Sequence, residues 1–154
     1  MTLGEARSHR HALQHWDAAP ADAPWKALFA FLVVPLLVGG PYIYREEADL
    51  HLTLAGVLQA AQVPLRHEVW IAPRKKIDFV SRGVGIEVKA IGGYTDWDTG
   101  KQLLRYGGTG AVRAILLVTT CWDHLRGPDN PQSYHVPVAA VHIRARRDRS
   151  FKLR

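Results

Sequence analysis

The chain has 154 residues, of which 47% are hydrophobic and 22% are charged. These values fit one globular domain with its own core and exclude a disordered chain. The single cysteine, Cys121, excludes an internal disulfide framework and a zinc site built from several cysteines. The formal net charge is +6, and a basic chain favours a polyanionic partner, usually a nucleic acid or an anionic membrane surface.

The most apolar stretch, ALFAFLVVPLLV, covers residues 27–38 and follows a polar, Ala-rich arm. It extends to residue 43, but two prolines and two glycines interrupt it. A helix needs about 20 apolar residues to cross a bilayer, so we expect no membrane span. The stretch is expected instead as a buried helix or strand, or as a surface covered by a second copy in a homodimer.

A helix is predicted over residues 45–62, because Leu50, Leu54 and Leu58 recur at helical spacing. Glu46 and Glu47 lie in its first turn, where acidic side chains suit the helix dipole. If the apolar face packs on a sheet, one of these two acids can reach a site there. Spacing from the apolar residues favours Glu47 and leaves Glu46 as a close competitor.

Strands are predicted over residues 67–72, 76–80 and 84–90, and the last two form an antiparallel hairpin with a turn at residues 81–83. A loop over 91–99 and a short helix over 101–106 follow. The apolar run 112–119 is typical of a buried strand, and Pro137 places the last strand, 136–143, near a sheet edge. This order predicts an α/β fold with a central mixed sheet flanked by helices.

The hairpin carries the residues that indicate chemistry. Glu87 and Lys89 are two apart and share a sheet face, and the turn brings Asp78 opposite Glu87. Two carboxylates suit Mg²⁺ or Mn²⁺, and the backbone carbonyl of Val88 could add a ligand. Lys89 could then position or deprotonate a water. The alternative is a surface strand with alternating charges.

The apolar neighbours of Asp78, Ile77 and Phe79, are both expected to face away from it.

On the helix after the loop, Gln102 and Tyr106 are four residues apart and share one face, so they could contact a phosphate or a metal-bound water. Lys101 and Arg105 lie on the neighbouring face and could contact backbone phosphates. The alternative is an amphipathic surface helix without a ligand.

The C-terminal residues 144–154 contain six basic residues and one acid, so they hold +5 of the net charge of +6. They are either a solvated tail that aids solubility or a grip on the phosphate backbone, which carries no sequence information. The predicted nucleic-acid contacts in this segment are Arg144, Arg146, Arg147 and Arg149.

The motifs REEADLHLTLAGVLQAA, RKKIDFV, GIEVKA and KQLLRY, within about residues 45–120, resemble the PD-(D/E)XK nuclease superfamily, which has a restriction-endonuclease-like fold. The pair in KQLLRY is similar to the motif of its RecB-like and lambda-exonuclease-like branch. The whole pattern is similar to small stand-alone members from phages and prophages. Ile77 stands before the aspartate where the name of the superfamily has proline.

The resemblance implies Glu47 (or Glu46) as the helix acid, Asp78 and Glu87 as metal ligands, and Lys89 as the catalytic lysine. It implies a Mg²⁺-dependent (or Mn²⁺-dependent) nuclease that acts on DNA in the cytoplasm of a bacterial or phage-infected cell. We expect an arm and apolar segment over 1–44, a nuclease-like core over 45–143 and a basic tail over 144–154. The alternative is a non-catalytic nucleic-acid-binding or assembly protein on the same fold.

Overall fold

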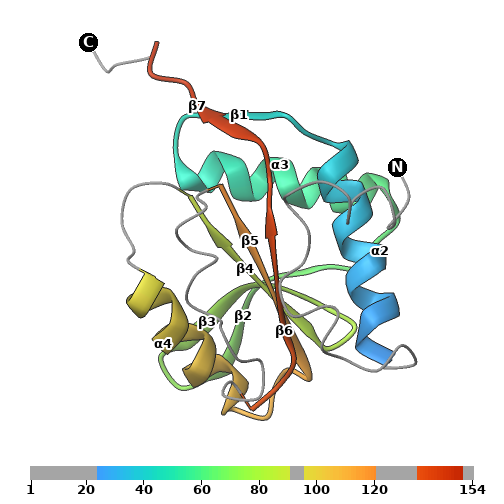
Figure 1. The fold of residues 1–154 in the computed structure, drawn as a ribbon, viewed down its shortest axis with the longest axis vertical. Helices are drawn as coiled ribbons and strands as arrows, with labels where there is room; N and C mark the ends of the chain where they lie inside the picture. Colours follow the sequence, from blue (N-terminus) through green and yellow to red (C-terminus); the bar gives the residue numbers. More distant parts are fainter. Residues whose placement is uncertain (1–23, 91–95, 121–134, 151–154) are drawn as a thin grey trace.

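The computed structural model describes residues 24–90, 96–120 and 135–150 (Figure 1). Its helices are α2 (Pro24–Val38), α3 (Glu47–Ala60) and α4 (Asp96–Gly107). Its strands are β1 (Tyr42–Tyr44), β2 (Arg66–Ala72), β3 (Lys75–Ser81), β4 (Val84–Lys89), β5 (Ala114–Thr119), β6 (Val138–His142) and β7 (Ala145–Arg147).

Five strands form a central sheet in the order β2-β3-β4-β5-β6. The pairs β2–β3 and β3–β4 are antiparallel, whereas β4–β5 and β5–β6 are parallel. The prediction of an α/β fold with a mixed central sheet is therefore confirmed. Strand β6, which follows Pro137, is an edge strand as expected.

The predicted hairpin is present, and its register runs from Ser81↔Val84 to Phe79↔Ile86. Its turn is made by Arg82 and Gly83, which both have positive φ angles, 51° and 82°. A right-handed strand twist favours such turns between antiparallel strands. The turn fixes which β3 residue faces which β4 residue, and so it sets the position of Asp78 relative to Glu87.

Each face of the sheet packs in its own core. Helices α2 and α3 cover one face, where Leu50 and Leu54 pack in a cluster with Ile86 and Val88. Helix α4 covers the other face (Figure 1), where Leu103 packs in a second cluster. Helices α3 and α4 therefore lie on opposite faces of the sheet.

The apolar stretch 27–38 is helical and lies in the core of its own chain. Phe29, Leu32, Val33 and Leu36 are almost completely buried in the cluster formed with α3 and the sheet. Of the interpretations left open by the sequence, a buried helix is therefore confirmed. No helix among the described residues is long and apolar enough to cross a bilayer.

Two local expectations were wrong or incomplete. Residues 96–99 of the loop expected over 91–99 belong to α4, and residues 91–95 lie outside the described residues. Forming the first turn of a helix is unfavourable, and each further residue adds a backbone hydrogen bond that offsets this free energy, so a longer helix is favoured. Within the basic segment, residues 145–147 form β7, which pairs in parallel with β1. The first 23 and last four residues of the expected arm and tail lie outside the described residues.

Candidate functional site

The pairing of strand β3 is interrupted at Asp78, although the strand itself is continuous. Within the described strands, the β3–β4 ladder stops at Phe79↔Ile86, one step before Asp78 would face Glu87. On the other side, the β2–β3 ladder passes from His67↔Phe79 to Val69↔Ile77, so Asp78 has no partner there either. Asp78 Oδ2 instead accepts a hydrogen bond of 2.8 Å from the backbone N–H of Val88.

This interruption corrects one prediction from the alternation of side chains. Ile77 and Phe79 do not face the same way, because Ile77 packs in the α4-side core and Phe79 in the α3-side core. On β2, Glu68 lies opposite the interruption and has a φ of 47°, a left-handed conformation that disturbs strand pairing. Asp78 therefore lies where the pairing of the sheet is irregular, with His51 of α3 in contact with it.

Glu87 and Lys89 on β4 are buried together, with relative exposures of 4% and 2%. Lys89 Nζ lies 3.3 Å from Glu87 Oε1. Their shared direction was predicted from the two-residue spacing. A buried charge is costly unless it is paired, so this pair is a specific feature of the interior and differs from the solvated strand that was the alternative.

Helix α3 contributes Glu47 and His51 from the opposite face. His51 Nε2 lies 3.4 Å from Glu47 Oε1 and 3.8 Å from Asp78 Oδ2. Hydrogen bonding with His51 lowers the pKa of Glu47, and Lys89 and the backbone N–H of Ala90 lower it further. Glu47 therefore lies close to the end of β4, which Figure 1 shows beside the start of α3.

Glu46, the competing acid, lies just before the first residue of α3 and is exposed. Its backbone N–H donates a 3.1 Å hydrogen bond to Asp49 Oδ2, as at other capped helix starts. Glu47, and not Glu46, is the acid whose electrostatic partners include Lys89. The spacing argument that favoured Glu47 agrees with this geometry.

Helix α4 reaches the same cluster through Gln102 and Tyr106. Gln102 Nε2 donates hydrogen bonds to Glu87 Oε1, at 3.1 Å, and to the Tyr106 hydroxyl. The Tyr106 hydroxyl donates a 3.1 Å hydrogen bond to the carbonyl of Lys76 on β3. The predicted common face of these two residues is present, and both side chains are tied to the strands that carry Asp78 and Glu87.

Burial and a neighbouring carboxylate raise the pKa of Glu87 and of Asp78. Burial, followed by repulsion from Asp78, raises the pKa of Glu87 to about 8. Burial is also the main reason that the pKa of Asp78 is raised. His51 is buried too, which favours its neutral form, but Glu47 and Asp78 outweigh that effect and raise its pKa. The cluster therefore has too little positive charge for all its acids to ionise at neutral pH.

The cluster offers few side-chain donors for a divalent cation. Among the described residues, no group of three or more His, Cys, Asp and Glu side chains is arranged to hold a metal ion. Asp78 and Glu87 offer two carboxylates, and Glu87 Oε2 is a buried oxygen without a hydrogen-bond partner. Mg²⁺ commonly binds one or two carboxylates and keeps several waters, so these residues fit such an ion.

The third predicted ligand, the carbonyl of Val88, stays a prediction, since the observed contact of Val88 with Asp78 uses its N–H.

His51 is a site residue that the sequence argument missed. Its signal was the spacing of four from Glu47, which puts both side chains on one helix face.

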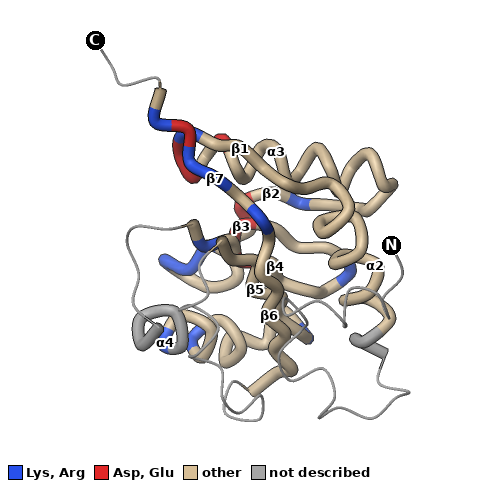
Figure 2. The backbone as a smooth tube through the Cα atoms, turned by 45° about the horizontal axis from the view of Figure 1, so that its top comes forward, with Lys and Arg blue, Asp and Glu red and all other residues tan. Residues whose placement is uncertain are grey.

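The predicted nucleic-acid contacts form two separate groups. Lys101 and Arg105 are exposed on α4. The other group lies on or beside β7, at the other end of the view in Figure 1, and Figure 2 shows basic residues along this strand. Arg147 Nε donates a 3.0 Å hydrogen bond to the carbonyl of Arg45, just before α3. The exposed arginines of this group are Arg144, Arg146, Arg147 and Arg149.

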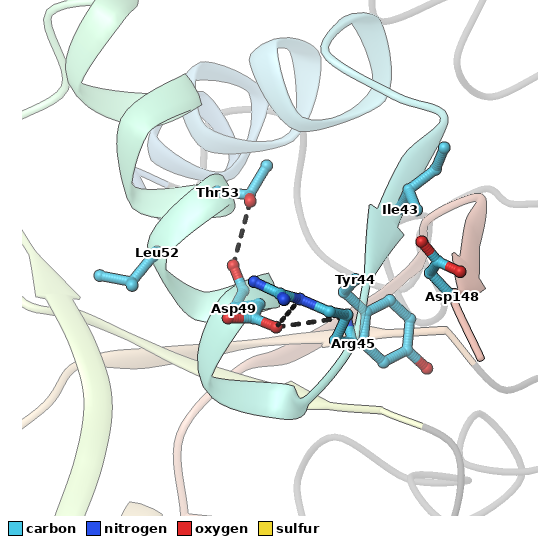
Figure 3. A pocket seen from close by; sticks show the side chains of 7 residues that line it. All are labelled: Ile43, Tyr44, Arg45, Asp49, Leu52, Thr53 and Asp148. Atoms are coloured by element: carbon cyan, nitrogen blue, oxygen red, sulfur yellow. Dashed lines mark hydrogen bonds and ion pairs between the residues drawn. The ribbon is translucent and has the colours of Figure 1, made fainter. Parts of the chain in front are cut away.

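A pocket of about 500 Å³ opens between β1, α3 and β7 (Figure 3). Arg45, Asp49 and Asp148 supply its charged side chains. Asp49 is already engaged, because Arg45 Nε lies 3.7 Å from its Oδ2. Its lining contains none of the residues of the carboxylate cluster, so the pocket is a separate feature of the surface.

Comparison with known proteins gives no relative: no family model matches the chain, and no significant match was found among curated proteins or solved structures.

Proposed function

We propose that the chain is a divalent-metal-dependent nuclease that hydrolyses phosphodiester bonds in DNA, with a core of the restriction-endonuclease-like kind. One observation carries the proposal. Asp78 lies at an interruption of the strand pairing, beside the buried pair of Glu87 and Lys89, and Glu87 Oε2 there lacks a hydrogen-bond partner. A structural ion pair would need neither the interruption nor the second acid.

Asp78 and Glu87 are the residues that would hold Mg²⁺ or Mn²⁺, with the Val88 carbonyl as a further ligand. A bound ion would polarise the phosphoryl group, lower the pKa of a water and offset charge on the leaving oxygen. Binding would also favour the ionised form of Glu87, whose pKa burial and Asp78 hold at about 8 in the free protein.

Lys89 is proposed to orient the attacking water and to offset the charge that grows on the phosphate. The water oxygen gives up a proton to solvent and bonds to phosphorus as the bond to the leaving oxygen breaks, and the leaving oxygen takes up a proton from solvent. Glu47 assists from α3, where it is 3.4 Å from His51. The described contacts of Gln102 and Tyr106 favour a role in holding Glu87 and β3 in place.

The basic strand β7 and the exposed cations of α4 are proposed to contact DNA phosphates. Such contacts depend on charge and carry no sequence information. Arg147 lies beside Arg45, which precedes the helix acid Glu47 by two residues. A phosphate backbone on β7 would therefore approach the start of α3, where the helix acid lies.

The test is cleavage of labelled single-stranded, double-stranded and branched DNA in Mg²⁺, Mn²⁺ or EDTA. We expect metal-dependent products from the parent protein and a loss of about 10²- to 10⁴-fold in Lys89→Ala, with DNA affinity retained. Because Lys89 is buried, Lys89→Met preserves more of its volume and serves as a second variant. Equal activity of both variants and the parent would defeat the assignment.

Glu47→Gln and Glu46→Gln form a matched pair, since the two acids are adjacent but only Glu47 lies near Lys89. We expect Glu47→Gln to lower cleavage and Glu46→Gln to leave it unchanged. DNA binding without products under every metal condition would favour the non-catalytic alternative.

A further inference from the structure

Trp70 on β2 is an exposed aromatic residue beside a cation. It is 66% exposed, and Lys76 Nζ lies 5.5 Å from the centroid of its ring. The two residues face each other across β2 and β3. Lys76 Nζ also lies 3.4 Å from Glu68 Oε1. A single exposed apolar side chain is common on protein surfaces, so the cation beside the ring and the nearness of Asp78 carry the argument.

The pair lies close to the carboxylate cluster. Lys76 precedes Asp78 by two residues on β3, a distance of about 7 Å along a strand. Val69 and Ile77 pack in the α4-side core, so Trp70 and Lys76 project from the α3 face. His51 approaches Asp78 from that same face. The ring therefore lies on the side of the sheet from which His51 contacts Asp78, whereas Glu87 and Lys89 project from the α4 face.

The surroundings of Trp70 are positively charged and held in place. The β2–β3 turn carries the run Arg74-Lys75-Lys76, in which Arg74 is exposed. The Tyr106 hydroxyl binds the Lys76 carbonyl, which ties this part of β3 to α4. An anionic strand would be attracted here.

We propose that Trp70 and Lys76 form a platform on which an unpaired base of single-stranded DNA stacks, next to the metal site proposed at Asp78 and Glu87. A base within a duplex has both faces covered, so only an unpaired base can use the ring in this way. Stacking on aromatic rings within a basic groove tolerates any sequence. This inference rests on the proposed nuclease function and narrows its substrate to DNA with a single-stranded segment.

The chain offers a matched control at the other end of β3. Phe31 is 39% exposed, and the Arg82 guanidinium lies 5.0 Å from its ring centroid. This aromatic–cation pair resembles Trp70 and Lys76 but lies at the hairpin turn, away from Asp78. Phe31→Ala therefore tests whether any exposed aromatic residue beside a cation binds DNA.

The experiment measures binding of a fluorescein-labelled oligonucleotide by anisotropy in EDTA, so that no cleavage occurs. We expect Trp70→Ala to weaken single-stranded binding by about 5- to 150-fold and to leave duplex binding within twofold. Trp70→Phe retains a ring and should stay within about fivefold of the parent. Phe31→Ala should match the parent. Tryptophan emission that the parent has and Trp70→Phe lacks should be quenched by single-stranded DNA.

Equal single-stranded affinity of Trp70→Ala and the parent would overturn the platform, as would equal loss with duplex DNA. A change of molecular mass by light scattering in Trp70→Ala, without a change in affinity, would assign the ring to contact with a second copy and also overturn it. Metal-dependent cleavage by the parent is scored separately. Cleavage with unchanged Trp70→Ala binding refutes the platform alone, whereas binding without cleavage refutes the nuclease.

Discussion

Gln102 Nε2 on α4 donates a 3.1 Å hydrogen bond to Glu87 Oε1, the same oxygen that lies 3.3 Å from Lys89 Nζ. The amide and the ammonium therefore share one carboxylate oxygen and leave Glu87 Oε2 without a partner. This arrangement fixes the carboxylate from one side and keeps its other oxygen available. We therefore expect a substitution of Gln102 on α4 to change the position of Glu87.

Gln102→Ala should lower cleavage, because it removes the hydrogen bond that holds Glu87. Its effect on the free energy of unfolding should be small, because it removes only a half-buried amide. We expect a loss of about 1–2 kcal/mol in the free energy of unfolding, measured by urea denaturation. Tyr106→Phe removes the hydrogen bond to Lys76 and should cost about 1 kcal/mol. Since the two side chains share a hydrogen bond, the double variant should lose less than the sum of the single losses. Strict additivity would contradict the shared network.

Metal-free protein should lose stability as pH rises from about 5 to 8. The pKa of Glu87 is raised from 4.5 to about 8, so in this window the folded chain holds a proton that the unfolded chain has released. The free energy of unfolding then falls with increasing pH. The raised pKa values of Asp78 and His51 act in the same direction.

Glu87→Gln isolates the contribution of this one carboxyl, because glutamine does not titrate. In urea denaturation with EDTA, its stability should depend less on pH between 5 and 8 than that of the parent. Added Mg²⁺ should raise the stability of the parent most at pH 8, where the ion stabilises the carboxylate form. Parallel pH curves for parent and variant would show that Glu87 is already ionised in the metal-free fold.

Gly85→Ala should destabilise the fold by about 1–3 kcal/mol, as expected when a packed core is overfilled. A Cβ at Gly85 would lie 2.5 Å from Ile77 Cδ1, and Ile77 is the residue before Asp78. Shortening the neighbour in Gly85→Ala/Ile77→Val should recover part of the loss. The matched control is Gly56→Ala on α3, where nothing lies within 4 Å of the added Cβ, and which should stabilise by about 0.5–1 kcal/mol. Equal effects of the two alanines on thermal denaturation would contradict the close packing of β3 on β4.

The hairpin and the acids on it could be predicted, because their signals are local. Alternation defines the strands, the turn at Arg82 and Gly83 sets the register, and the register places Asp78 near Glu87. The interruption at Asp78 could not be predicted in the same way. It depends on a left-handed residue in another strand, Glu68, and on a side-chain hydrogen bond to the Val88 backbone.

Contacts between distant parts of the chain gave no sequence signal. Strands β1 and β7 have three residues each and come from opposite ends of the described chain, so neither has a recognisable period. His51 is different, because its spacing from Glu47 was visible in the sequence. It was missed because a histidine on a largely apolar helix indicates a site only once the structure places it beside Asp78.

The most direct test of the central claim is Mn²⁺ binding followed by electron paramagnetic resonance, with Mg²⁺ as the competitor. The parent should bind Mn²⁺, Mg²⁺ should displace it, and both Asp78→Asn and Glu87→Gln should lose this binding while Glu46→Gln keeps it. Mn²⁺ binding that is the same in the parent, Asp78→Asn and Glu87→Gln, or no binding by the parent even with single-stranded DNA present, would contradict the account.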